Sequence, residues 1–154
     1  MNKKLILCRH AQAEPALPGV SDFDRPLTAA GIAQATEAGK WLASRKIKID
    51  GLVTSPATRA RQTAQLLAGQ TGLNQLFENS RIYEASPTTL LAVVNNLPDE
   101  VRNVLLVGHN PGLSYLATIL TGHRYDLDTS QLVVIQLQVS AWAMVSGGTG
   151  SQTS

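Results

Sequence analysis

The sequence predicts an α/β protein, a three-layer α/β/α sandwich around a mostly parallel, mixed sheet. Three short apolar runs, at residues 4–8, 51–54 and 104–107, lack the alternation of a half-exposed strand, as is typical of strands buried on both faces. Apolar residues recur at helical spacing between these runs, and strands that alternate with helices form parallel sheets. Two further strand-like segments, 131–137 and 141–145, could form a hairpin and add an antiparallel strand.

Start signals for helices follow the predicted strands. Thr28 is a suitable N-cap for a helix that runs to about Ser44. Ser55-Pro56 and Ser86-Pro87 each place a capping residue before a proline, and Asn110-Pro111 opens a fourth helix. The expected buried face of the first helix consists of Ile32, Ala35, Gly39 and Leu42.

The bulk composition is that of an ordinary compact domain. A chain of 154 residues with 44% hydrophobic and 16% charged residues is long enough to bury a core, and we assign one domain to residues 1–146. The polar tail, 147–154, is expected to be disordered. A net charge of +2 gives no argument for nucleic acid or a membrane surface, and 5% aromatic residues do not favour base stacking.

Cysteine usage and the absence of a targeting pattern suggest a compartment. The chain has one cysteine, Cys8, so an internal disulfide is excluded, as suits a reducing cytoplasm. No signal-peptide pattern and no apolar run of about 18 residues occurs. We therefore expect a cytoplasmic protein without a membrane span.

All three central strands lead into an arginine or a histidine. Arg9-His10 follows the first run, Arg59 the second and His109 the third. Open α/β sheets bind ligands at the carboxyl ends of their strands, and the helix N-termini that follow favour anions. Each residue has an ordinary alternative as a surface pair, a solvated helix charge or a turn residue. Their shared placement at strand ends favours one anion pocket.

The residue types in this pocket suit phosphoryl transfer. A neutral imidazole at His10 could attack phosphorus and form a covalent phosphohistidine. The guanidinium groups of Arg9 and Arg59 could each hold two phosphate oxygens. His109 could donate a hydrogen bond to an oxygen that gains charge in the transition state.

Four motifs in order resemble the histidine phosphatase superfamily, which has the phosphoglycerate mutase-like fold. They are Arg9-His10-Ala11, residues 55–64 (SPATRARQTA), residues 107–111 (VGHNP), and the loop 22–28 (DFDRPLT) with Gly31 and Gln34. The last of these resembles the short SixA-like branch of phosphohistidine phosphatases. The resemblance covers at least residues 4–120.

The resemblance implies a role for each matching position. His10 matches the nucleophile, and Arg9, Arg59 and His109 match the rest of the phosphate pocket. Arg61 falls on a variable position and is expected to be an exposed helix charge.

The same resemblance places Arg25 at the pocket rim as a substrate contact. The alternative for Arg25 is a salt bridge with Asp22 or Asp24 within the loop.

The general acid is the least defined part of the predicted site. Glu84 resembles the position of the family's acid and lies at a fourth plausible strand end, before the helix that starts at Ser86-Pro87. It could instead be a charge in the first turn of that helix. Asp22, Asp24 and Glu14 are alternative acids.

The sequence therefore predicts a metal-independent phosphatase without a cofactor. His10, His109 and His123 are spread too widely to suggest a metal site. The substrate would be a phosphorylated histidine on a partner protein, reached through an open pocket, since 65–90 is too short for a large cap. The alternatives are a small-molecule phosphomonoesterase and a non-catalytic phosphate-binding domain.

Overall fold

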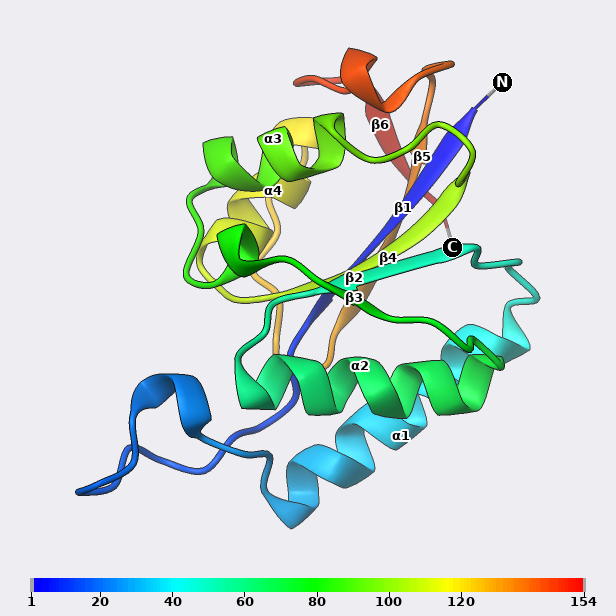
Figure 1. Ribbon diagram of the computed structural model, residues 1–154. Helices are drawn as coiled ribbons and strands as arrows, with labels where there is room; N and C mark the ends of the chain where they lie inside the picture. Colours follow the sequence, from blue (N-terminus) through cyan, green and yellow to red (C-terminus); the bar gives the residue numbers. More distant parts are fainter. Residues whose placement is uncertain (1, 154) are drawn as a thin grey trace.

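The computed structural model describes residues 2–153, which form a mixed sheet in the order β3-β2-β4-β1-β5-β6 (Figure 1). The central strand β1 pairs in parallel with β4, and β4 pairs in parallel with β2, whereas β5 runs antiparallel to β1. This arrangement confirms the predicted fold class. The strands are β1 (Lys3–Arg9), β2 (Gly51–Thr54), β3 (Phe77–Glu78), β4 (Asn103–Gly108), β5 (Leu132–Leu137) and β6 (Gly150–Thr153).

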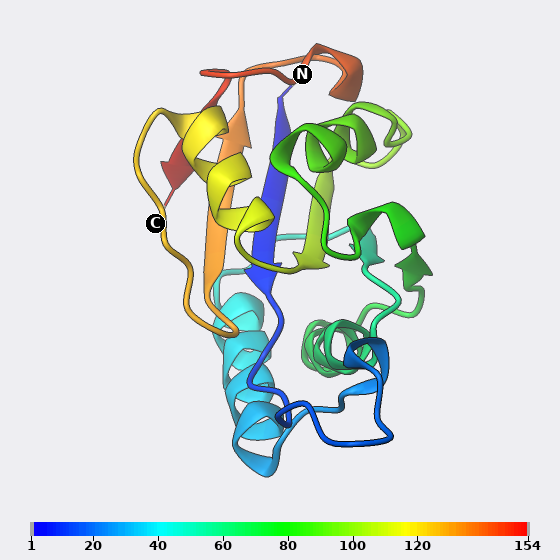
Figure 2. The ribbon, with the colours of Figure 1, turned by 90° about the vertical axis from the view of Figure 1, so that its left-hand side faces the viewer.

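Two pairs of helices cover the two faces of the sheet (Figures 1 and 2). They are α1 (Ala29–Ser44) and α2 (Thr58–Thr71) on one face, and α3 (Pro87–Asn95) and α4 (Gly112–Thr121) on the other. Three 3-10 turns complete the fold: η1 (Asp22–Asp24), η2 (Ser80–Ile82) and η3 (Trp142–Met144). None of the helices within residues 2–153 is long and apolar enough to cross a membrane.

Strand β1 explains why the sequence shows no alternation there. Leu5 and Leu7 pack into the core under α3 and α4, while Ile6 and Cys8 pack into the core under α1 and α2. All four side chains are fully buried. Because successive strand residues point to opposite faces, a strand between two helix layers needs apolar residues at every position.

Two of the three predicted N-caps, Thr28 and Ser86, have the expected hydrogen bonds, whereas Ser55 is not the N-cap of α2, which is Ala57. The Thr28 side chain accepts a hydrogen bond from the Gly31 amide at 2.9 Å, and Ser86 accepts one from the Thr89 amide at 3.2 Å. The helices predicted at Ser55-Pro56 and Asn110-Pro111 begin slightly later, with α2 at Thr58 and α4 at Gly112. On α1, the expected core residue Ile32 is instead 47% exposed.

The C-terminal segment differs from the sequence prediction in two places. Residues 141–145 were expected as a strand but contain η3, because Trp142 is fully buried and its Nε1 donates to the Val101 carbonyl at 2.8 Å. The expected disorder from Gly147 is wrong for β6, which pairs antiparallel with β5. Backbone hydrogen bonds hold this polar edge strand, and composition does not reveal them.

Candidate active site

The carboxyl ends of β1, β2 and β4 bring the predicted residues together. Arg9 is the last residue of β1 and lies opposite Gly108 of β4. His10 and His109 directly follow these two strands, and the His10 amide still donates to the Gly108 carbonyl at 3.0 Å. Arg59 lies in the first turn of α2, after β2. A pocket of about 410 Å³ is lined by Arg9, His10, Gln12, Ala13, Asp22, Arg25, Arg59, Glu84, His109, Asn110 and Thr129.

His10 is held as a neutral imidazole with one free ring nitrogen. Its Nδ1 lies 2.8 Å from the Ala11 carbonyl oxygen, which can only accept, so Nδ1 carries the hydrogen and Nε2 keeps its lone pair. Burial, with the charges of Arg59 and Arg9, lowers the pKa of His10 from 6.5 to about 4. The side chain therefore has the protonation state of a nucleophile at neutral pH.

His109 lies beside the nucleophile, with the two ring centroids 5.2 Å apart. Its Nε2 is 2.7 Å from the Ser55 hydroxyl, which itself accepts from the Ala57 amide at 3.2 Å. Burial, followed by the charges of His10 and Arg59, lowers the pKa of His109 to about 3. When the Ser55 hydroxyl donates to Nε2, the ring hydrogen of His109 is on Nδ1.

Three buried nitrogen atoms of this site have no hydrogen-bond partner within the described part of the chain. They are Arg9 Nε, Arg59 Nε and His109 Nδ1. A buried donor without a partner costs about 1–3 kcal/mol, so these three nitrogens need acceptors from outside the protein, which water or a bound ligand can supply. Phosphate oxygens are acceptors of this kind.

Asp22 accepts hydrogen bonds from three side chains at the pocket. Tyr83 Oη donates to Oδ2 at 2.6 Å, and Arg59 Nη2 donates to the same oxygen at 3.1 Å. Arg25 contacts Oδ1 through Nε at 3.0 Å and Nη2 at 2.9 Å. The Tyr83 hydrogen bond, with the charge of Arg59, lowers the pKa of Asp22 to about 2. An ionised carboxylate cannot donate a proton, so Asp22 does not fit the role of general acid.

Arg25 has the salt bridge that sequence analysis gave as its alternative. Besides the two contacts with Asp22, its Nη1 donates to the Glu14 carbonyl at 2.8 Å, so each guanidinium nitrogen has a partner. A direct contact of Arg25 with substrate stays a prediction. Asp24 and Glu14 are not among the residues that line the pocket, and the Asp24 carboxylate accepts from the Ser21 hydroxyl at 2.9 Å.

Glu84 lines the pocket, as expected, but from a different local structure. The residues before it form η2 rather than a strand. Its φ of 49° lies in the left-handed region, which is uncommon for a residue other than glycine. Such strain occurs preferentially at functional sites. The role of Glu84 as the acid stays a prediction.

Cys8, next to the site in sequence, is fully buried, and burial raises the pKa of its thiol to about 12. A thiol that stays protonated is not the nucleophile. Within residues 2–153, no group of three or more His, Cys, Asp and Glu side chains is arranged to hold a metal ion.

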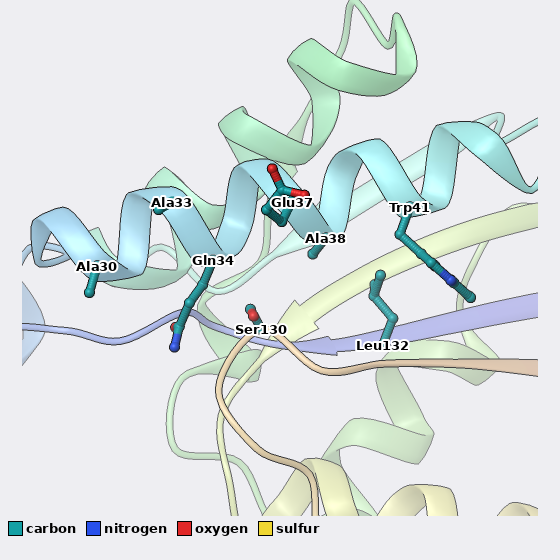
Figure 3. Close-up of a pocket in the computed structure, with 8 residues that line it drawn as sticks. All are labelled: Ala30, Ala33, Gln34, Glu37, Ala38, Trp41, Ser130 and Leu132. Carbon is teal, nitrogen blue, oxygen red and sulfur yellow. The ribbon is translucent and has the colours of Figure 1, made fainter.

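A larger hollow of about 690 Å³ lies between α1 and the start of β5 (Figure 3). It is lined by Ala30, Ala33, Gln34, Glu37, Ala38, Trp41, Ser130 and Leu132. Glu37 is the one charged side chain in this lining, and no histidine or arginine belongs to it. The groups capable of phosphoryl transfer are therefore in the smaller pocket at the strand ends.

Comparison with known families agrees with this geometry. The family model "Histidine phosphatase superfamily (branch 1)" matches residues 5–87, which include the strand ends of β1 and β2. The chain belongs to the histidine phosphatase superfamily. Among its relatives, an uncharacterized protein of Mycobacterium tuberculosis is 40% identical over 114 residues, which cover 73% of this chain and 68% of the relative.

One SixA sequence and one solved SixA structure are similar to this chain. Phosphohistidine phosphatase SixA of Escherichia coli K12 is 30% identical over 122 residues, covering 76% of this chain and 73% of SixA. The solved structure of the protein histidine phosphatase SixA complexed with tungstate aligns with a TM-score of 0.82 at 26% identity, over 98% of this chain and 94% of that one. These similarities confirm the SixA-like resemblance and the phosphoglycerate mutase-like fold.

Sequence reasoning missed Tyr83 and Ser55 as parts of the site. Tyr83 contacts Asp22, and its ring packs edge-on against His109 at 5.5 Å. Ser55 was interpreted only as a helix cap, although its hydroxyl also contacts His109. Only the position of Ser55 at a strand end gave a signal, since strand ends meet at the site.

Proposed function

We propose that this protein is a phosphatase that forms a covalent phosphohistidine on His10, and that its substrate is a phosphohistidine carried by another protein. The observation that carries the proposal is the state of His10. Its ring is neutral and its Nε2 is free, in a pocket with three unpaired nitrogens of Arg9, Arg59 and His109. A non-catalytic phosphate-binding domain would not need a nucleophile in this state.

In the first step, the Nε2 lone pair of His10 forms a bond to phosphorus while the bond to the leaving group breaks. The leaving group keeps the electron pair of that bond. The hydrogen bond from Nδ1 to the Ala11 carbonyl stabilises the positive charge on the ring. Arg9 and Arg59 neutralise the phosphoryl oxygens, and Nδ1 of His109 donates to one of them.

In the second step, a water molecule attacks phosphorus on the phosphorylated enzyme. The bond between phosphorus and Nε2 breaks, its electron pair returns to His10, and the water gives up one proton to solvent or to Glu84. Inorganic phosphate leaves, and the neutral imidazole is restored. The cationic groups already present supply the positive charge for both steps, so we expect no metal requirement.

The lack of a buried general acid in the pocket favours a phosphohistidine substrate over a phosphate ester. Glu84 is exposed, and Asp22 is ionised, so the pocket offers no buried carboxylic acid. An imidazole leaving group can take its proton on the ring nitrogen that is not bonded to phosphorus, directly from solvent. An alkoxide leaving group depends more strongly on a positioned acid. An exposed acid such as Glu84 would be sufficient for the departure of an imidazole, which depends less on a positioned acid.

The second candidate is a small-molecule phosphomonoesterase, because a pocket of about 410 Å³ also admits small phosphates. Wild type and His10→Ala are assayed first with an aryl phosphate, and the variant should lose turnover. The kcat/KM for a phosphorylated histidine-containing carrier protein is then compared with that for common sugar phosphates. A preference of more than about tenfold for a sugar phosphate would overturn the substrate assignment.

A cytoplasmic location is also part of this proposal. It is supported by the buried free thiol of Cys8, the one cysteine of the chain.

A further inference from the structure

We propose that Asp22 is a positioning residue that fixes the orientation of Arg59 for phosphate binding and anchors the loop segment that carries Glu84. The inference rests on the proposed function, because it assigns Arg59 to the phosphate.

The carboxylate of Asp22 accepts three hydrogen bonds and contacts a fourth donor nitrogen, Nη2 of Arg25. An ionised carboxylate has about four acceptor sites. The two contacts of Arg25 occupy Oδ1, and the contacts of Arg59 and Tyr83 occupy Oδ2. Although the Asp22 side chain is 42% exposed, each of its two oxygens faces two protein donor nitrogens or hydroxyls, so the carboxylate orients those donors.

Asp22 holds Arg59 by two bonds at one edge of the guanidinium group. Nη1 donates to the Asp22 backbone carbonyl at 2.7 Å, and Nη2 donates to its Oδ2 at 3.1 Å. The side chain of Arg59 is 5% exposed, and its Nε is left without a partner. Because both terminal nitrogens are engaged with one residue, the guanidinium cannot turn without breaking both bonds. The orientation of the Nε edge of the guanidinium, which has no partner in the protein, is thereby fixed.

The same carboxylate joins three segments that are far apart in sequence. Arg59 belongs to α2, Tyr83 follows η2, and Arg25 follows η1. Tyr83 directly precedes Glu84, so its bond to Asp22 also restrains the predicted acid. The turn η1 buries none of its residues. Hydrogen bonds to Asp22, together with the edge-on contact of Phe23 with the Tyr83 ring at 5.2 Å, therefore hold η1 against the pocket.

Asp24 provides a matched control for Asp22. It lies in the same turn and carries the same charge, but its carboxylate contacts the Ser21 hydroxyl and it does not line the pocket. A loss caused by changing the net charge of η1 would affect both positions. A loss caused by misplacing Arg59 would follow Asp22 alone.

The test compares Asp22→Asn, Asp22→Glu and Asp24→Asn with wild type. Turnover of an aryl phosphate gives kcat and KM, and inhibition by tungstate reports binding of a phosphate-like oxyanion. Asparagine replaces one acceptor oxygen with a donor, so we expect tungstate inhibition to weaken by about tenfold and kcat/KM to fall by about 10- to 100-fold. Asp22→Glu should recover part of both losses, and Asp24→Asn should stay within about twofold of wild type.

Tyr83→Phe keeps the ring and removes one of the three hydrogen bonds to the Asp22 carboxylate. It therefore provides a second test if Asp22→Asn fails to fold. It should weaken tungstate inhibition by about threefold to tenfold. Unchanged or tighter tungstate inhibition in the folded Asp22 or Tyr83 variants would overturn the proposal. That result is expected if the Asp22 carboxylate does not position Arg59 and only repels the bound oxyanion through its negative charge. Wild type without His10-dependent turnover would instead overturn the proposed function.

Discussion

Acidification below about pH 6.5 should destabilise this protein through His10. The pKa of His10 is 6.5 in an unfolded chain and about 4 in the folded pocket, mainly because of burial. Between these values the unfolded chain binds a proton that folded His10 does not. The contribution of His10 to the free energy of unfolding is therefore fully present above about pH 6.5 and is lost as the pH falls toward about 4.

The magnitude follows from the two pKa values. Between about pH 7 and about pH 5, a shift of this size removes about 2 kcal/mol from the free energy of unfolding for His10 alone. His109, whose pKa is lowered to about 3, adds a loss of the same sign. Asp22 contributes nothing in this window, because its pKa is lowered from 3.8 to about 2 and its stabilisation is lost only at lower pH.

The measurement is urea unfolding at the two pH values, followed by tryptophan fluorescence, to which the buried Trp142 and the exposed Trp41 both contribute. The His10→Asn variant should lose about 2 kcal/mol less than wild type on acidification. His123→Asn, at an exposed position, should lose as much as wild type. Equal losses in wild type and His10→Asn would refute the reasoning that His10 is buried neutral.

Four further predictions concern the pocket and the packing of the helices. Arg59→Ala should lower kcat/KM by a factor of about 10² or more, whereas Arg61→Ala should lower it only slightly. The reason is that the two side chains point about 200° apart on α2, and equal losses of kcat/KM would contradict this geometry. Activity should persist in EDTA, and activity that vanishes and returns with magnesium or zinc would count against the mechanism. Gly112→Ala should destabilise the fold by about 1–3 kcal/mol in urea unfolding and lower kcat, because a Cβ there would lie 2.0 Å from the Ala85 carbonyl oxygen. Gly69 lies inside α2, and a Cβ there would have no atom within 4 Å. Gly69→Ala should therefore raise the free energy of unfolding by up to about 1 kcal/mol, and a decrease would contradict this explanation.

The layers of the fold were predictable because several local signals agreed. Buried strands such as β1 need apolar residues on both faces, and Thr28 and Ser86 are local caps that act within one helical turn. The placement of His10 and His109 at adjacent strand ends followed from topology alone. In each case, the deciding interaction is local in sequence or is imposed by a parallel sheet.

The remainder depends on contacts that a linear pattern does not contain. The hydrogen bond between Asp22 and Tyr83 joins residues 61 positions apart, and neither lies on a regular helix or strand. Strand β6 has no apolar side chain and is held by backbone pairing with β5. The 3-10 turn at Trp142 replaces a predicted strand because an indole is buried there with a distant backbone partner.

The most direct test of the proposed mechanism is to trap the phosphorylated enzyme. Wild type is mixed with an aryl phosphate, quenched in alkali to preserve acid-labile phosphoramidates, digested and mapped by mass spectrometry. We expect one acid-labile phosphoryl group on His10, which is absent from His10→Ala. A phosphoryl group trapped on another residue, or rapid turnover by His10→Ala, would contradict it.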